Sequence, residues 1–134
     1  MNIDDHLKAF QEHKEAIFDW AIGVKGILNS QRIIGLHASR GIIELLSAFL
    51  HEEEKITSGA QLNHRWFKSR KCGERLPEFS KKEVITPQLV ELELLCEDLT
   101  YGKKKPPKDI ERAIRLFNEI EKEISELREH HEKK

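Results

Sequence analysis

The segment from about Ser30 to His51 limits what this chain can fold into, because as a helix it would be apolar on almost every side. At ~100° per residue, its polar side chains share an arc of roughly 80°. They form one stripe that consists of His37, Arg40, Glu44, Ser47 and His51. A helix with so wide an apolar surface needs neighbours on most of its circumference, so it is expected at the centre of a helical domain.

Three other stretches provide the expected neighbours, since apolar residues recur in them at spacings of three and four. They cover about 3–27, 87–101 and 110–127. Hydrophobic residues make up 38% of the chain and charged residues 35%, a composition that suits amphipathic helices with solvated outer faces. The sequence therefore predicts an all-α fold, an antiparallel up-and-down bundle of four to five helices.

Residues that start or stop helices mark the ends of these stretches. Gly26 is expected to end the first helix, and Ser30 is expected to cap the second. Thr86 and Pro87 have the pattern of a cap followed by proline at the first helical position. The charged tail 128–134 is expected to fray, because chain ends are poorly ordered unless something fixes them.

Between the second and the third of these long helices, the sequence predicts one short helix and one loop. The short helix follows a cap within Thr57–Gly59 and carries Leu62, Trp66 and Phe67. Residues 71–80 are expected to form a loop, because a glycine and a proline interrupt any apolar periodicity there.

Chain length, charge and cysteine content set further expectations. A length of 134 residues matches one domain, so we expect a single domain over 1–134. A net charge of -1 excludes a global basic field, so any attraction to nucleic acid has to be local. Cys72 and Cys96 lack CxxC spacing and should be free thiols. With no signal peptide and no apolar run of ~20 residues, we expect a cytoplasmic protein without membrane contact.

The polar stripe of the central segment has two interpretations. In the first, the stripe is the narrow solvent face of the helix, and Arg40 and Glu44 form an exposed i, i+4 pair. In the second, the stripe lines a groove where His37 and His51 titrate near neutral pH and Arg40 holds a phosphate. The glycines of the segment indicate close packing of another helix in either case.

The stretch 61–82 is a second candidate surface, since seven cationic side chains against two carboxylates give it a net charge of +5. Its candidate ligand-binding residues are His64, Arg65, Trp66, Lys68 and Arg70. Cations interleaved with aromatic rings can neutralise phosphates and stack the bases of single-stranded nucleic acid. The alternative is that Trp66 and Phe67 anchor the short helix to the core while the cations stay in water.

Common catalytic and metal-binding motifs do not occur in the chain. The sequence has no Gly-x-Ser-x-Gly elbow, no P-loop and no Gly-x-Gly-x-x-Gly. The acidic stretch 87–101 lacks a Glu-x-x-His pair, and the histidines and cysteines lack the number of partners that a zinc site requires. We therefore expect no catalytic set, no metal and no cofactor.

Three segments of the chain carry a likeness to a known family. Small residues followed by apolar ones fill Leu36–Leu50, an aromatic residue and a turn close Leu99–Gly102, and an amphipathic stretch spans Ile110–Leu127. In these features the chain resembles the HEPN family, small helical domains of prokaryotes often encoded beside minimal nucleotidyltransferases. The resemblance implies a homodimeric helical bundle that binds nucleotide or nucleic acid, or that docks a nucleotidyltransferase partner.

Nuclease members of that family carry Arg-x(4 to 6)-His, and a dimer brings two copies together to cut RNA. The match here is Arg32 to His37, with Ile33 where the family has a polar residue. Five residues of helix also turn these two side chains ~140° apart. Our main hypothesis is therefore a non-catalytic binding domain. The alternatives are a metal-independent ribonuclease that uses Arg32 or Arg40 with His37, and a structural protein-interaction module.

Overall fold

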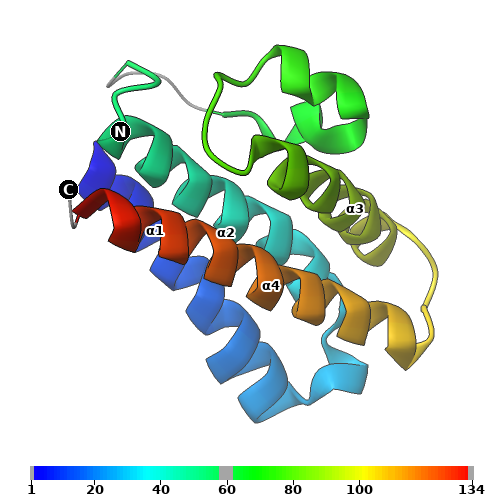
Figure 1. Ribbon diagram of the computed structural model, residues 1–134. Helices are drawn as coiled ribbons and strands as arrows, with labels where there is room; N and C mark the ends of the chain where they lie inside the picture. The colour runs from blue at the N-terminus through cyan, green and yellow to red at the C-terminus, as the bar shows by residue number, and fades with distance from the viewer. Residues whose placement is uncertain (1, 58–61, 133–134) are drawn as a thin grey trace.

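Four long α-helices carry the fold in the computed structural model, which describes residues 2–57 and 62–132 (Figure 1). These helices are α1 (Ile3–Glu15), α2 (Gln31–Glu52), α3 (Lys82–Tyr101) and α4 (Pro107–Glu132). No strand occurs within the described residues. The predicted all-α class is therefore confirmed.

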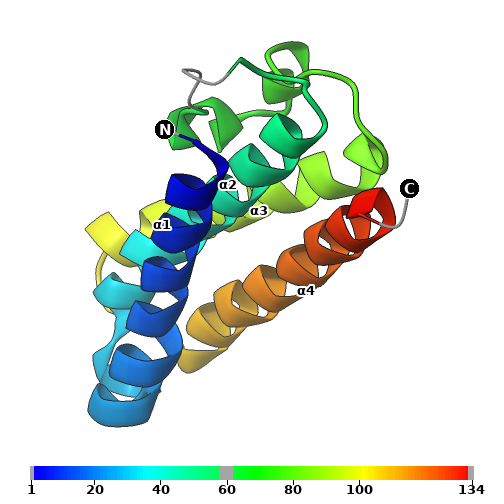
Figure 2. The same ribbon diagram turned by 90° about the vertical axis from the view of Figure 1, so that its left-hand side faces the viewer.

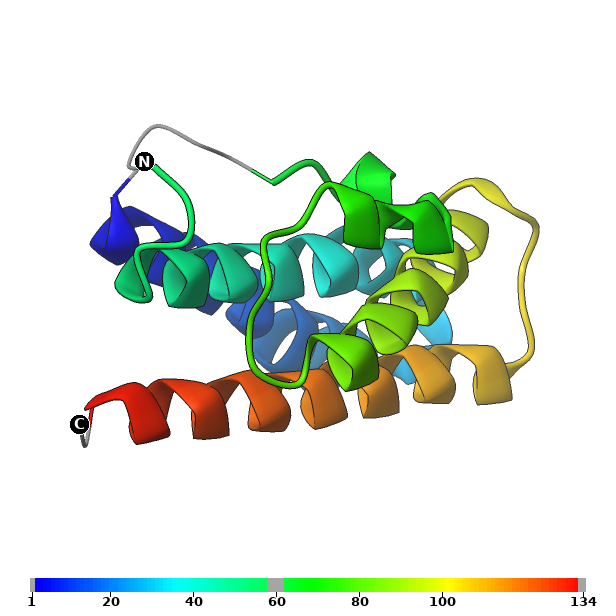
Figure 3. The same ribbon diagram turned by 45° about the horizontal axis from the view of Figure 1, so that its top comes forward.

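Among the described residues, four shorter helical elements lie between α1 and α3. The π-helical segment η1 (Ala16–Lys25) continues α1 directly, and the 3-10 turn η2 (Ile27–Asn29) leads into α2. Two further 3-10 turns, η3 (His64–Lys68) and η4 (Arg70–Glu74), precede α3. Figure 3 shows η3 and η4 above the start of α3, and α3 inclined to α4.

α2 is the central helix of the structure, as its apolar circumference predicts. Thirteen of its 22 residues are buried, and it contacts α1, α3 and α4 (Figure 2). Within the described part of the chain, α2 alone has the length and hydropathy of a membrane span. However, 72% of its most apolar window is buried inside the protein. A core helix that is covered on most sides has the same apolar composition as a membrane span.

Glycines allow the helices that flank α2 to approach it closely. A Cβ atom on Gly35 would lie 2.8 Å from the Leu99 Cβ and 2.9 Å from the Thr100 nitrogen of α3. A Cβ atom on Gly41 would lie 2.9 Å from the His13 Cβ of α1. Contacts below 3.0 Å require a neighbour to move, so the predicted role of these glycines in close helix packing is confirmed.

The first predicted helix changes form halfway along its length. The α-helical part ends at Glu15, and the chain continues as a π-helix to Lys25. Gly26 then stops the helix with φ 85°, as predicted. Ser30 precedes α2, but its hydroxyl donates to the Ala21 and Gly26 carbonyl oxygens at 2.8 and 2.7 Å. Ser30 therefore ties the turn to η1 and does not cap the amides of α2.

The region before α3 differs from the prediction in two ways. α3 begins at Lys82, so Pro87 lies inside it, and the predicted start at Thr86 is wrong. Pro87 cannot donate to the carbonyl oxygen of Glu83, but the fully buried Ile85 anchors the extra turn to the core. The predicted loop 71–80 is also wrong at its start, since η4 occupies Arg70–Glu74.

Residues 128–132 are helical, although the sequence predicts fraying over 128–134, of which 133–134 lie outside the described residues. α4 continues to Glu132, because the Arg128 Nε donates to the Glu52 Oε1 at 2.6 Å and ties the last turns to α2. The short helix around Trp66 is present as η3, with Asn63 as its cap. The cap predicted within Thr57–Gly59 lies mostly outside the described residues.

Gly35→Ala is expected to destabilise the protein by about 1–3 kcal/mol, because the added methyl group meets the α3 backbone and forces the two helices apart. Urea unfolding monitored by circular dichroism measures this free energy. Gly73→Ala is the control, since a Cβ atom there has no neighbour within 4 Å. Equal urea midpoints for the two variants would contradict the close-packing role of Gly35.

Candidate functional site

Most of the polar stripe of α2 faces α1 and forms a ladder of side-chain pairs. His13 and His37 lie 2.9 Å apart between their Nδ1 atoms, and the His6 Nδ1 lies 2.6 Å from the Glu44 Oε2. The ring of His51 stacks on that of His6 at a centroid distance of 5.1 Å. α1 therefore supplies partners for His37, Glu44 and His51, and these three half-buried side chains face α1.

The spacing of these side chains explains how the ladder forms. His6 and His13 are seven residues apart on α1, and His37, Glu44 and His51 repeat at the same interval on α2. Seven residues are close to two helical turns, so each set lies along one line of its helix. The predicted Arg40–Glu44 pair is replaced by the longer-range contact between Glu44 and His6.

The paired histidines of the ladder favour the neutral state. Burial lowers the pKa of His13 below its ordinary value of 6.5, and the facing His37 lowers it further. Burial and the neighbouring Arg40 likewise lower the pKa of His37. A neutral pair can share one Nδ1–H between two nitrogens, whereas two imidazolium rings would repel each other.

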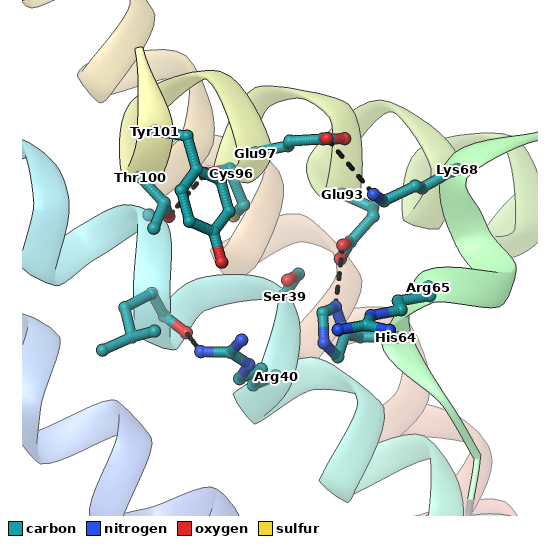
Figure 4. A pocket seen from close by; sticks show the side chains of 12 residues that line it. Ser39, Arg40, His64, Arg65, Lys68, Glu93, Cys96, Glu97, Thr100 and Tyr101 are labelled. Carbon is teal, nitrogen blue, oxygen red and sulfur yellow. Dashed lines mark hydrogen bonds and ion pairs between the residues drawn. The ribbon is translucent and has the colours of Figure 1, made fainter.

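Arg40 leaves the ladder and lines a cavity of about 220 Å³ between α2, η3 and α3 (Figure 4). We refer to it as the α2–α3 cavity. α2 contributes Gly35, Leu36, Ser39 and Arg40; η3 contributes His64, Arg65 and Lys68; α3 contributes Glu93, Cys96, Glu97, Thr100 and Tyr101. The cavity thus joins one residue of the predicted stripe to three residues of the predicted basic segment.

Two guanidinium groups of the α2–α3 cavity have no carboxylate partner among the described residues. The Arg40 Nη1 donates only weakly, to the Leu36 carbonyl oxygen at 3.4 Å, and no ion pair involves Arg65. Lys68 differs, since its Nζ lies 3.2 Å from the Glu97 Oε1. Arg40 and Arg65 are therefore the cations of this cavity that remain available for an external anion.

A buried carboxylate fixes the histidine of the cavity. Glu93 is only 3% exposed, and its Oε1 lies 2.9 Å from the His64 Nδ1. Its second oxygen, Oε2, is buried without a hydrogen-bond partner. This contact holds the His64 ring against α3 and couples the position of η3 to that of α3 (Figure 4).

The rim of the cavity near the end of α3 carries an exposed aromatic side chain. Tyr101 is 77% exposed, and Figure 4 shows its ring beside the cavity. The neighbouring Thr100 hydroxyl donates to the Cys96 carbonyl oxygen at 2.7 Å. Burial raises the pKa of Cys96 to about 12, so this thiol stays protonated and is a poor nucleophile.

Other candidate residues lie away from this cavity. Trp66 packs partly against the core, with the Arg75 guanidinium 5.5 Å from its ring centroid, and Phe67 is fully buried. The anchoring role predicted for these aromatics is confirmed. The side chain of Arg70 lies outside the described part of the structure.

The side chains of the Arg32 to His37 match do not come together, as their separation of ~140° around the helix predicts. The Arg32 Nη1 donates to the Thr100 carbonyl oxygen at 2.7 Å, at the end of α3. His37 faces α1 and pairs with His13. The two side chains of this motif therefore lie on different sides of α2.

Glu93 is a buried residue of the cavity that the sequence interpretation did not single out. It lies four residues after Leu89 and three before Cys96, which is the spacing of the buried stripe. A carboxylate at a core position needs a buried partner, so this spacing was a usable signal. No spacing in the sequence marks Tyr101 as a residue of the cavity, because its exposure depends on which elements pack against α3.

Neither a metal site among the described residues nor a similarity to a known protein assigns a function to this cavity. No group of three or more histidine, cysteine, aspartate or glutamate side chains within the described residues could hold a metal ion. Cys72 and Cys96 are free and buried, as predicted. No protein-family model, curated protein or solved structure matches the chain, so the likeness to the HEPN family stays a prediction.

The pKa shifts of His13 and His37 predict that stability falls in acid. Their folded-state pKa values lie below the ordinary value of 6.5, so the unfolded chain binds more protons as the pH drops. The stabilisation is complete above pH 6.5 and is lost as the pH falls through the folded values. Thermal unfolding between about pH 7.5 and about pH 5 should show a decreasing Tm.

The double variant His13→Asn/His37→Asn should show a shallower loss of Tm over the same pH range. His130→Asn is the control, because His130 is exposed on α4. A double variant with the full pH dependence of the wild type would show that other groups control acid stability.

Proposed function

We propose that this protein is an antiparallel helical bundle whose α2–α3 cavity binds the phosphate group of a nucleotide or of single-stranded RNA without catalysing a reaction. The observation that carries the proposal is that Arg40 and Arg65 line one cavity and have no carboxylate partner in the described part of the chain. The pairing of His6 with Glu44 and of His13 with His37 supports the antiparallel order of α1 and α2.

The chemistry of the two arginines favours a phosphate over other anions. A guanidinium presents several N–H donors in a planar fork that matches phosphate oxygens, and it stays charged at every physiological pH. Arg40 comes from α2 and Arg65 from η3, so the two groups approach the cavity from different elements (Figure 4). Two guanidinium groups in this arrangement can bind one phosphate group from two sides.

The size of the cavity limits how much of a ligand it can enclose. At about 220 Å³ it is smaller than the roughly 300–1,000 Å³ typical of sites for drug-sized ligands. A phosphate with part of its sugar fits such a volume, and the base would extend toward the rim. Tyr101 lies at this rim and offers an exposed ring on which a base can stack.

Arg40→Gln and Arg65→Gln should each weaken AMP binding about tenfold, the loss expected when a charged hydrogen bond of about 1.5 kcal/mol is removed. Isothermal titration calorimetry measures this affinity. Adenosine, which lacks the phosphate, should bind far more weakly than AMP. Affinity for a short single-stranded RNA should fall steeply with salt, because phosphate contacts release counterions.

Arg115→Gln provides the matched control for these variants, because Arg115 is an exposed arginine on α4 that lies outside the cavity. It should bind AMP with wild-type affinity. The proposal would be overturned by wild-type protein that binds neither AMP nor RNA, by equal affinity for AMP and adenosine, or by an RNA affinity that does not change with salt.

A further inference from the structure

A second cavity, of about 410 Å³, lies at the start of α2, away from Arg40 and Arg65. We refer to it as the η2 groove. It is lined by Lys25, Leu28, Asn29, Gln31, Arg32, Ile33 and Lys104. Three of these residues are cationic and none is acidic, which distinguishes the groove from the α2–α3 cavity with its two glutamates.

The charges of the η2 groove are not neutralised by the described parts of the protein. Arg32 donates to a neutral carbonyl oxygen, that of Thr100. No ion pair involves Lys25 or Lys104. Three positive charges around one concave surface create a local field that attracts an acidic partner.

Three exposed apolar side chains, which we refer to as the apolar strip, lie on the segment of chain that leads into this groove. Trp20, Val24 and Leu28 are 53%, 67% and 56% exposed, and they follow one another at intervals of four residues along η1 and η2. Leu28 belongs to both the strip and the groove, and Val24 is adjacent to Lys25. Figures 1 and 2 show η1 and η2 together at the lower end of the molecule.

We propose that the η2 groove and this apolar strip dock an acidic amphipathic helix of a partner protein. Such a helix places apolar anchors on one face and carboxylates beside them. This pattern matches exposed Trp20, Val24 and Leu28 near three cations that have no carboxylate partner among the described residues. The interaction is separate from phosphate binding in the α2–α3 cavity.

The observations favour this partner over two others that also carry negative charge. Nucleic acid offers phosphates to the cations, but its backbone gives Val24 and Leu28 no apolar surface to bury. An anionic membrane offers both negative charge and an apolar interior. However, a membrane surface does not fill a concave groove, whereas a helix that binds in the groove does.

The probe for this proposal is a synthetic peptide of about 18 residues with leucines on one helical face and glutamates on the other, long enough to form a helix on binding. A fluorescein label reports binding to the full chain through anisotropy. The control peptide replaces each glutamate by lysine. The acidic peptide should bind, and the basic peptide should not, because its charges repel the groove.

Charge reversal at the groove separates specific docking from general attraction. Lys25→Glu/Lys104→Glu should weaken binding of the acidic peptide at least about tenfold, and Trp20→Ala should weaken it through loss of apolar contact. Lys122→Glu, an exposed lysine on α4, should leave the affinity unchanged. All these positions except Trp20 are charged surface residues, so the variants should fold.

Several results would overturn the proposal. The acidic peptide could fail to bind, or it could bind the charge-reversed protein equally well. Vesicles that contain phosphatidylserine could bind through Trp20 while the peptide does not, which would indicate a membrane surface. Self-association that Trp20→Ala abolishes would identify a second copy of the chain as the occupant. AMP affinity is measured separately, so loss of peptide binding does not affect the phosphate proposal.

Discussion

The burial of α2 on nearly its whole circumference is the constraint on which the rest of this structure depends. A helix with thirteen buried residues out of 22 has to be covered by α1, α3 and α4 at once. At Gly35 the backbone of α3 comes so close that no side chain fits between the two helices. This contact sets the separation of α2 and α3, and thereby the width of the cavity that Arg40 and Glu93 line.

The polar residues of α2 divide between two sides of the helix, and this division separates a structural role from the proposed binding role. His37 and Glu44 pair with histidines of α1, so their hydrogen-bonding groups are used within the fold. Arg40 lies toward α3 and η3, where Glu93 and Glu97 are engaged by His64 and Lys68. Because the local carboxylates already have partners, the charge of Arg40 stays available for a ligand.

Basic residues of the chain also gather at two separate places with different surroundings. Around Arg65 they adjoin the buried carboxylate of Glu93 and the exposed ring of Tyr101, which suits a small polar ligand. Around Lys104 they adjoin exposed apolar side chains, which suits a protein surface. The net charge of -1 does not indicate either patch, because acidic residues elsewhere in the chain balance their positive charge. Local arrangement, and not net charge, therefore determines what each surface can attract.

The sequence by itself determined the helical class, the central position of α2 and the end of the first helix at Gly26, because periodicity and backbone freedom are local properties. The tertiary structure alone decided that His37 pairs with His13, that Glu93 is buried against His64, and that Arg40 and Arg65 line the same cavity. These contacts join residues far apart in the chain. Their partners follow from how the helices pack against one another, which no spacing within one segment specifies.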